Sequence, residues 1–234
     1  MTKKSLHSIK DWKIDVGFQH PLCSIRSYHI FSQKDCNNII EAGEEAAQKQ
    51  GGWTTDRHDE APTTDIPFDI IGGSYKLIFQ KWKNRLIRKI LTPILFRDYH
   101  AKFISFEDFF LVRYTTESQP GLKIHRDGTV ISCVIQLNND FEGGGTYIEN
   151  LGHPLRHNTG DICIHSGWFR HGAYPIQSGI RYVLIGFCNI EAKWYTHHKL
   201  QPSAPYEPDH KTLRRAIKPE FRILNSSIRI TDNK

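Results

Sequence analysis

The sequence has no pair of cysteines in the CxxC spacing that is typical of zinc or redox sites. Its five cysteines form an odd and scattered set, which excludes a disulfide framework. No segment approaches the ~20 consecutive apolar residues that a membrane-spanning helix needs. The residues after Met1 are polar and charged, unlike the apolar centre of a secretory signal. We therefore expect a soluble protein of the cytoplasm or another intracellular compartment, with no membrane partner.

Internal repeats and low-complexity tracts are also lacking. The 234 residues, 38% of them hydrophobic, are enough for one sizeable core and fit one domain with extensions better than two domains. The net charge of +6 favours acidic partners but does not single out nucleic acid. Two basic runs, at 81–85 and 211–215, are most simply explained as solvated faces of helices.

The first hundred residues contain two helical patterns. After a strand expected at 25–31, Ser32 can cap a helix whose apolar stripe continues to Gly51-Gly52, where the helix ends. A second helix is predicted over about 74–91, and Pro93 limits or kinks it. The polar, proline-containing segment at 52–72 is predicted to be a long ordered loop of the kind that often forms a lid or binding loop.

From about Phe106 onward, short segments rich in Val, Ile, Phe and Tyr alternate with Gly, Asn, Asp and Pro. Several short strands at this spacing are typical of a sandwich or jelly roll. We expect strands near 108–114, 121–126, 130–138, 145–149, 161–166, 171–176 and 180–190. The order predicts an α+β fold, in which N-terminal helices support a double-stranded β-helix (jelly roll) core.

A histidine and an aspartate stand two residues apart in Ile124-His125-Arg126-Asp127-Gly128. In a strand such residues share a face, so His125 and Asp127 can reach one ion together. A second histidine from a distant strand, His171, would complete the two-histidine, one-carboxylate set that suits Fe(II). Taken alone the motif is short, and a surface turn at Asp127-Gly128 explains it equally well.

An arginine follows His171 by ten residues and opens an apolar strand. Burying Arg181 at this position would be costly without an anion. A guanidinium also pairs well with a carboxylate through two parallel hydrogen bonds. Arg181 is therefore a candidate for binding the carboxylate of 2-oxoglutarate.

Between about residues 110 and 189, the chain resembles the prolyl and lysyl hydroxylase branch of the Fe(II)/2-oxoglutarate-dependent oxygenases, of the prolyl 4-hydroxylase α-subunit type. The matching motifs occur in the family's order: Arg113-Tyr114, His125-Arg126-Asp127, Phe141-Glu142-Gly143-Gly144-Gly145-Thr146, His171-Gly172 and Gly179-Ile180-Arg181-Tyr182. This ordered set is more specific than any single member.

The resemblance implies a role for each matching residue. His125, Asp127 and His171 match the iron ligands, and Arg181 matches the partner of the distal carboxylate of 2-oxoglutarate. Tyr114 and Thr146 match positions that often bond the same carboxylate, although a core tyrosine and a turn threonine are alternatives. Fe(II), 2-oxoglutarate and O2 are the implied cofactor and cosubstrates, with ascorbate as a reductant.

The segment that begins at Gly52 also resembles part of this branch, in lysyl-hydroxylase-like proteins. We expect Trp53, Arg57, His58 and Asp65 to belong to a loop that borders the substrate. The alternative is that Trp53 and Arg57 only anchor a long loop.

The chain is thus divided into an N-terminal helical support region with the loop (1–105), an oxygenase core (106–190) and a basic tail (191–234), within one structural domain. The expected reaction is hydroxylation of a prolyl or lysyl side chain of a peptide or protein, with succinate and CO2 as coproducts. An oxidative demethylase of nucleic acid is an alternative that the positive charge permits. However, no arginine follows Arg181 before Arg214, where that group carries a second one. A catalytically silent jelly-roll binding module is the third alternative.

Overall fold

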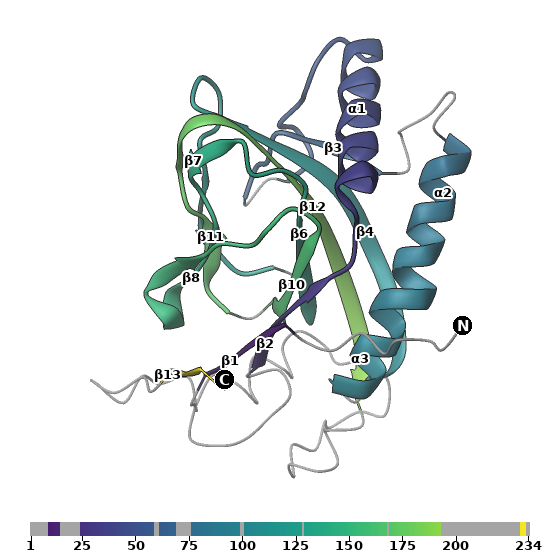
Figure 1. Ribbon diagram of the computed structural model, residues 1–234, viewed down its shortest axis with the longest axis vertical. Coiled ribbons are helices and arrows are strands. Elements are labelled where there is room, and N and C mark those ends of the chain that lie inside the picture. The colour runs from purple at the N-terminus through teal and green to yellow at the C-terminus, as the bar shows by residue number, and fades with distance from the viewer. Residues whose placement is uncertain are drawn as a thin grey trace.

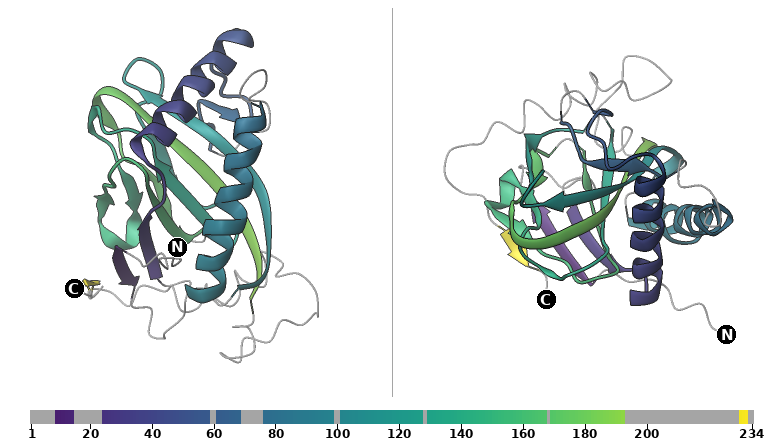
Figure 2. Two further views of the ribbon diagram at one scale, coloured as in Figure 1. Left: turned by 45° about the vertical axis from the view of Figure 1, so that its right-hand side comes forward. Right: turned by 90° about the horizontal axis from the view of Figure 1, so that it is seen from above.

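The computed structural model describes residues 9–14, 24–58, 61–68, 76–98, 101–127, 129–167, 169–192 and 230–232. Two antiparallel sheets lie over one another, and the helices pack on the outer side of the larger sheet (Figures 1 and 2). The helices come from the N-terminal part of the chain and cover one face of the main sheet, as the sequence predicted.

The main sheet has nine strands in the order β13-β1-β2-β10-β6-β12-β4-β3, and β7 pairs with β12 beside this path. Its strands are β1 (Lys10–Ile14), β2 (Ser24–His29), β3 (Asp65–Pro67), β4 (Ala101–Thr115), β6 (Ile131–Gln136), β7 (Phe141–Gly143), β10 (Asp161–Ser166), β12 (Ile176–Ala192) and β13 (Ile230–Asp232). The N-terminal hundred residues therefore contribute strands to this sheet as well as helices.

The smaller sheet has four strands in the order β5-β11-β8-β9. They are β5 (Leu122–His125), β11 (His171–Ala173), β8 (Thr146–Ile148) and β9 (His153–Leu155), with a 3₁₀ turn, η4 (Glu149–Leu151), between the last two in the chain. Because β5 and β11 are neighbours, this sheet brings together two segments that are far apart in the sequence.

Strand β6 shows how the sheet separates core from cavity. All six of its residues are buried, which means that both faces of the strand are covered. Cys133 and Ile135 belong to the core that contains the helices, whereas Val134 packs between the two sheets. Since alternate residues of a strand share a face, Ser132 and Gln136 lie on the same side as Val134. This side faces the smaller sheet.

The first helix, α1 (Gln33–Lys49), begins with the predicted cap. The Ser32 hydroxyl accepts a hydrogen bond from the backbone N–H of Asp35, and the Asp35 carboxylate accepts one from the backbone of Ser32. Such a reciprocal cap satisfies two donors that a helix start leaves unpaired. The buried stripe then packs on the main sheet, where Gly43 lies against Leu111 of β4.

The second helical segment runs through Pro93, so the expectation that this proline limits the helix was wrong. It consists of α2 (Lys76–Arg85), a π-helical stretch η3 (Leu86–Leu91) and α3 (Thr92–Asp98). Pro93 lies directly after the π-helical stretch, where the helix changes from one hydrogen-bond pattern to another and a residue without an N–H is accommodated. The backbone N–H of Thr92 bonds to the Ile87 carbonyl, as in a π turn. Within the described part of the chain, no helix is long and apolar enough to cross a membrane.

All seven strands expected between 108 and 190 are present; β10 has the expected ends, and the other six have at least one shifted end. The segment at 52–72 is not entirely a loop, because β3 pairs with β4 at the edge of the main sheet. Strands β1, β7, β9 and β13 were not expected. Residues 59–60 and 69–72 of the loop, and 193–229 and 233–234 of the basic tail, lie outside the described residues.

Candidate active site

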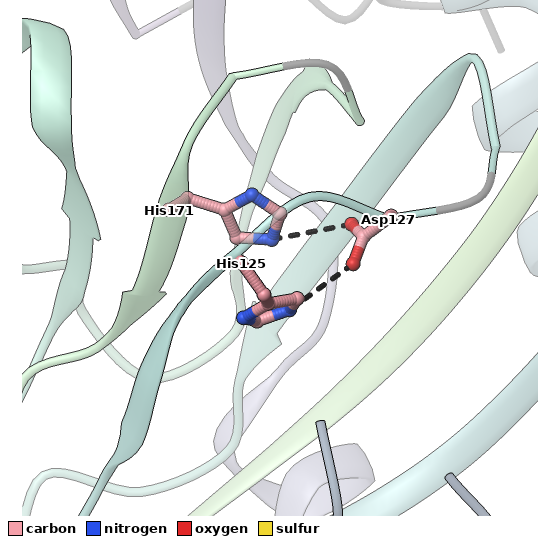
Figure 3. Close-up of side chains that lie close together, drawn as sticks. All are labelled: His125, Asp127 and His171. Atoms are coloured by element: carbon pink, nitrogen blue, oxygen red, sulfur yellow. Dashed lines mark ion pairs between the residues drawn. The ribbon is translucent and has the colours of Figure 1, made fainter. Parts of the chain in front are cut away.

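His125, Asp127 and His171 meet at one point between the sheets (Figure 3). His125 is the last residue of β5, and His171 is the first of β11, directly opposite it in the register. Asp127 lies two residues beyond β5, where its backbone N–H donates to the carbonyl of Gly167. The carboxylate oxygens of Asp127 lie 3.2 Å from Nε2 of His125 and 3.2 Å from Nε2 of His171.

The far nitrogen of each ring fixes the imidazole for metal binding. Nδ1 of His125 lies 2.8 Å from the Lys123 carbonyl oxygen, and Nδ1 of His171 lies 2.8 Å from that of Phe169. A carbonyl oxygen only accepts, so Nδ1 of each ring carries a hydrogen, and Nε2 is the nitrogen that can lose its proton and bind a metal. The Ser132 hydroxyl donates to Asp127 and orients the carboxylate. Two imidazole nitrogens and one carboxylate that point to the same position fit an Fe(II) ion.

The charges in this cluster support one another. Burial of Asp127 disfavours its ionised form, but the charge of His171 and hydrogen bonds from His125, His171 and Ser132 outweigh it and hold the Asp127 pKa well below the ordinary value. Burial also opposes the charge on His171, and the neighbouring carboxylate of Asp127 nevertheless raises the pKa of His171. The carboxylate is therefore ionised at neutral pH and available to a cation.

Arg181 lies in β12 and is one of the largest fully buried side chains. Its Nε donates to Oε1 of Gln136 at 3.2 Å, and one terminal nitrogen lies 3.4 Å from the Gly145 carbonyl oxygen. Within the described part of the chain, no carboxylate lies within 4.0 Å of its guanidinium. Burial lowers the pKa of Arg181 to about 10. A buried cation that has only neutral partners fits an anionic ligand.

Tyr114 and Thr146 lie beside Arg181. Tyr114 is directly opposite Arg181 in the register of β12 and β4, and the guanidinium lies 5.6 Å from the centre of its ring. Burial raises the pKa of Tyr114 to about 12, so its hydroxyl stays protonated and can donate. Thr146, at the start of β8, is also buried. Both face the same space as Arg181.

One cavity of about 410 Å³ joins these groups. The metal-binding cluster lies on its smaller-sheet side, and Arg181 and Tyr114 lie in the main sheet. Apolar side chains complete the wall: Phe110, Leu122, Val134, Ala173, Val183, Ile185 and Phe187. The cavity is large enough for a small dicarboxylate beside the metal and for part of a further molecule.

The four residues of the expected substrate loop divide into two pairs. Arg57 and His58 line the cavity, with the His58 ring 4.8 Å from that of Phe110. Asp65 is fully buried in β3 and accepts a hydrogen bond from Arg57 at 2.5 Å. Trp53 does not line the cavity; its indole N–H donates to Glu44 of α1 at 3.2 Å. Arg57 thus anchors the loop through Asp65 and also lines the cavity, so both expectations for this residue apply.

His165, which the sequence analysis did not single out, is a fully buried residue of the cavity wall. Its ring centre lies 4.5 Å from that of His171, and burial lowers the pKa of His165 to about 3. Ser132, Phe110 and Phe187 were also missed. Alternation along a strand could have placed Ser132 beside Val134, but it does not show which face of a strand lines a cavity.

No family model matches the chain. In sequence, the chain is 27% identical over 184 residues to human procollagen-lysine,2-oxoglutarate 5-dioxygenase 2, an alignment that covers 72% of this chain and 24% of that protein. The chain therefore spans about a quarter of the length of the curated relatives it matches.

Solved structures share its fold. The viral collagen prolyl hydroxylase of Paramecium bursaria Chlorella virus-1 superposes with a TM-score of 0.52 at 16% identity, covering 70% of this chain and 94% of that one. A Trichoplax adhaerens prolyl hydroxylase, solved with a peptide of hypoxia inducible factor, gives a TM-score of 0.56 at 8% identity over 71% and 84% of the two chains.

The chain is related to the 2-oxoglutarate-dependent oxygenases. Its sequence relatives are procollagen lysine dioxygenases, and its fold is that of 2-oxoglutarate oxygenases. The names of the sequence relatives give 2-oxoglutarate as their cosubstrate, and in this chain the cluster of His125, Asp127 and His171 could hold a metal ion such as Fe(II).

Proposed function

We propose that this chain is an Fe(II)- and 2-oxoglutarate-dependent dioxygenase that hydroxylates a prolyl or lysyl side chain of a peptide or protein. The observation that carries the proposal is the combination within one cavity of a two-histidine, one-carboxylate cluster and a buried arginine without a carboxylate partner among the described residues. A metal-binding cluster alone would suit many sites. The additional buried cation is what a dicarboxylate cosubstrate requires.

Each side chain has a defined task in this proposal. Nε2 of His125, Nε2 of His171 and the Asp127 carboxylate hold Fe(II). Arg181 pairs with the distal carboxylate of 2-oxoglutarate, and the hydroxyls of Tyr114 and Thr146 donate to it. When bound, iron, 2-oxoglutarate and O2 supply the oxidising chemistry, which converts the cosubstrate to succinate and CO2 while a C–H bond is hydroxylated. Ascorbate is proposed as the reductant that keeps the iron in the Fe(II) state.

The fold serves this task by placement. We propose that the two sheets are the halves of a double-stranded β-helix in the 106–190 core, with the 1–105 region as its support. Neighbouring strands of the smaller sheet then hold the two histidines, whereas the main sheet holds Arg181 at a fixed distance from them. The apolar wall excludes water from the reacting atoms, which limits side reactions. Arg57 and His58 are proposed to border the bound substrate, whose carbon must lie next to the metal.

The test is the visible charge-transfer band of iron-chelated 2-oxoglutarate, recorded without oxygen. The band should form with the unaltered protein, disappear in His171→Ala and need higher 2-oxoglutarate concentrations in Arg181→Ala. His153→Ala and Arg170→Ala are matched controls, because both side chains are exposed and neither lines the cavity. Folded, iron-loaded protein that gives no band would contradict the proposal and favour a binding module.

Oxygen-dependent succinate release then distinguishes the substrate classes. Peptide libraries should stimulate it, whereas stimulation by methylated oligonucleotides, weakened by salt, would favour the nucleic-acid demethylase.

A further inference from the structure

His165 carries a buried hydrogen-bond acceptor that the proposed function does not use. Its Nδ1 lies 2.9 Å from the carbonyl oxygen of Ser166. Because a carbonyl oxygen only accepts, Nδ1 carries the hydrogen, and Nε2 keeps a lone pair. Nε2 is buried and has no hydrogen-bond partner within the described residues. A buried acceptor without a donor is unfavourable, so its partner is expected to be a molecule that enters the cavity.

The position of His165 places this acceptor near the metal-binding cluster. Its ring lies 4.5 Å from that of His171, centre to centre. Across the sheet, His165 is directly opposite Ser132, whose hydroxyl donates to Asp127. Arg181, by contrast, contacts Gln136, which lies four residues further along β6, or about 13 Å. The acceptor is therefore at the metal end of the cavity, where the substrate must react.

The chemistry of the expected molecules identifies the donor. 2-Oxoglutarate at neutral pH has only acceptor oxygens, and the side chain of a prolyl residue has no N–H or O–H group. A lysyl side chain ends in an ammonium group with three donors. Among these three ligands, only the lysyl side chain can satisfy Nε2 of His165.

The positive charge of Arg57 at the cavity wall is compensated, so it does not exclude a cationic ligand. Arg57 is 2.5 Å from Asp65 and 2.5 Å from Asp108, so one guanidinium is shared by two carboxylates. Asp108 is part-exposed, so this charge compensation lies close to the protein surface. Arg126 also lines the cavity, but its side chain is exposed, where solvent screens its charge. The apolar wall of Phe110 and Phe187 can hold the methylene groups.

We propose that this cavity selects an amine-bearing side chain of the lysyl class, and that Nε2 of His165 accepts a hydrogen bond from its ammonium group. This inference rests on the proposed function, and it decides between the prolyl and lysyl substrates that the function leaves open. It makes His165 a specificity-determining residue, which contacts the substrate but not the cosubstrate.

The experiment compares three peptide libraries that differ only in a central Lys, norleucine or Pro. Norleucine keeps the alkyl chain and lacks the amine. Succinate release and peptide KM are measured with the unaltered protein, His165→Phe and His165→Gln. The Lys library should be preferred by the unaltered protein, and His165→Phe should lose roughly 10- to 100-fold of that preference. His165→Gln should keep part of it, because its amide oxygen is also an acceptor.

The iron–oxoglutarate band separates the two hypotheses. If the band does not form in the unaltered protein, the proposed function itself fails. If the band forms in all three proteins, the inference is overturned by any of three results: no response to the Lys library, a preference for Pro or norleucine, or an unchanged Lys preference in His165→Phe. Loss of the band in His165→Phe with retention in His165→Gln would assign the acceptor to the metal site and overturn the substrate role.

Discussion

At the scale of single residues, the site depends on side chains that orient the metal ligands. His125 and His171 are each held by a backbone carbonyl, which no substitution of a side chain removes. Asp127 is different, because the Ser132 hydroxyl holds one of its oxygens. Partners of this kind fix the direction of a ligand and are often worth 10- to 100-fold in metal affinity.

Ser132→Ala should therefore weaken Fe(II) binding by roughly tenfold while the protein remains folded. The carboxylate keeps its charge but loses the donor that aligns it. Anaerobic titration with Fe(II), followed by the charge-transfer band at saturating 2-oxoglutarate, measures the change. Ser166→Ala is the matched control, since the Ser166 hydroxyl contacts the Val130 carbonyl at 3.4 Å. Equal affinities in the two variants would show that Ser132 does not orient the ligand.

Residue-level prediction from the sequence was strongest where chemistry and spacing agreed. His125 and Asp127 were predicted as joint ligands because they stand two residues apart. Arg181 was predicted as an anion-binding residue because burying a cation in an apolar strand is costly. The structure brings all of these residues to one cavity, whereas their roles stay predictions. His165 was missed because it stands in a strand of apolar residues, where a histidine that fills a core and one that lines a cavity have the same pattern.

At the scale of elements, the sequence predicted the long elements but only some of the short ones. Helix α1 and strand β10 were predicted because each contains enough residues to show its period. Strands β3, β7 and β9 have three residues each, too few for any period. Strands β8 and β11 are as short, but they were expected as parts of the longer segments 145–149 and 171–176. In β3, Pro67 also favoured a loop, but β3 is an edge strand, where a proline need not donate to a neighbour.

Helix α3 is joined to the main sheet by a partly buried carboxylate. Asp98, at the end of α3, accepts a hydrogen bond from the Tyr28 hydroxyl of β2 at 2.5 Å and lies 3.3 Å from Arg26. Burial opposes the charge of Asp98, but hydrogen bonds from Arg97 and Tyr28 and the charge of Arg26 lower its pKa below the ordinary value of 3.8. A carboxyl group with a lowered folded pKa contributes stability above its unfolded pKa, which is lost as the pH falls through the folded value.

Asp98→Asn should therefore lower the Tm at neutral pH and flatten its decline in acid. The neutral amide keeps the shape but loses the charged contacts, for which we expect about 1–3 kcal/mol. Thermal unfolding between about pH 7 and pH 3 measures both effects, with Asp56→Asn as a control because Asp56 is exposed. A Tm difference that is the same at every pH would mean that packing, not charge, accounts for the loss.

At the scale of the whole molecule, the site lies where two sheets must stay together. The smaller sheet carries His125 and His171, and the main sheet carries Arg181 and Ser132. The sequence predicted the jelly-roll class of this arrangement from the succession of short strands. It did not predict that β1 and β2 extend the main sheet, because pairing between distant segments leaves no local pattern in either of them.

Since the residues that bind the metal and the cosubstrate come from both sheets, binding of both should stabilise the entire fold. A ligand that binds only the folded state raises stability by about 2.7 kcal/mol at a concentration 100 times its Kd. For a domain of this size, each kcal/mol corresponds to roughly 2–4 °C in Tm. Mn(II) can replace Fe(II) in air, so Mn(II) with 2-oxoglutarate should raise the Tm by several degrees.

The pattern of this shift among variants tests whether the two sheets share one site. In Arg181→Ala, Mn(II) alone should still stabilise the protein, but 2-oxoglutarate should add little because its distal carboxylate has lost the guanidinium. In His171→Ala both additions should fail, since the cosubstrate needs the metal as well as Arg181. If 2-oxoglutarate stabilised His171→Ala as fully as the unaltered protein, the cosubstrate would bind independently of the metal, and the two halves of the cavity would be separate sites.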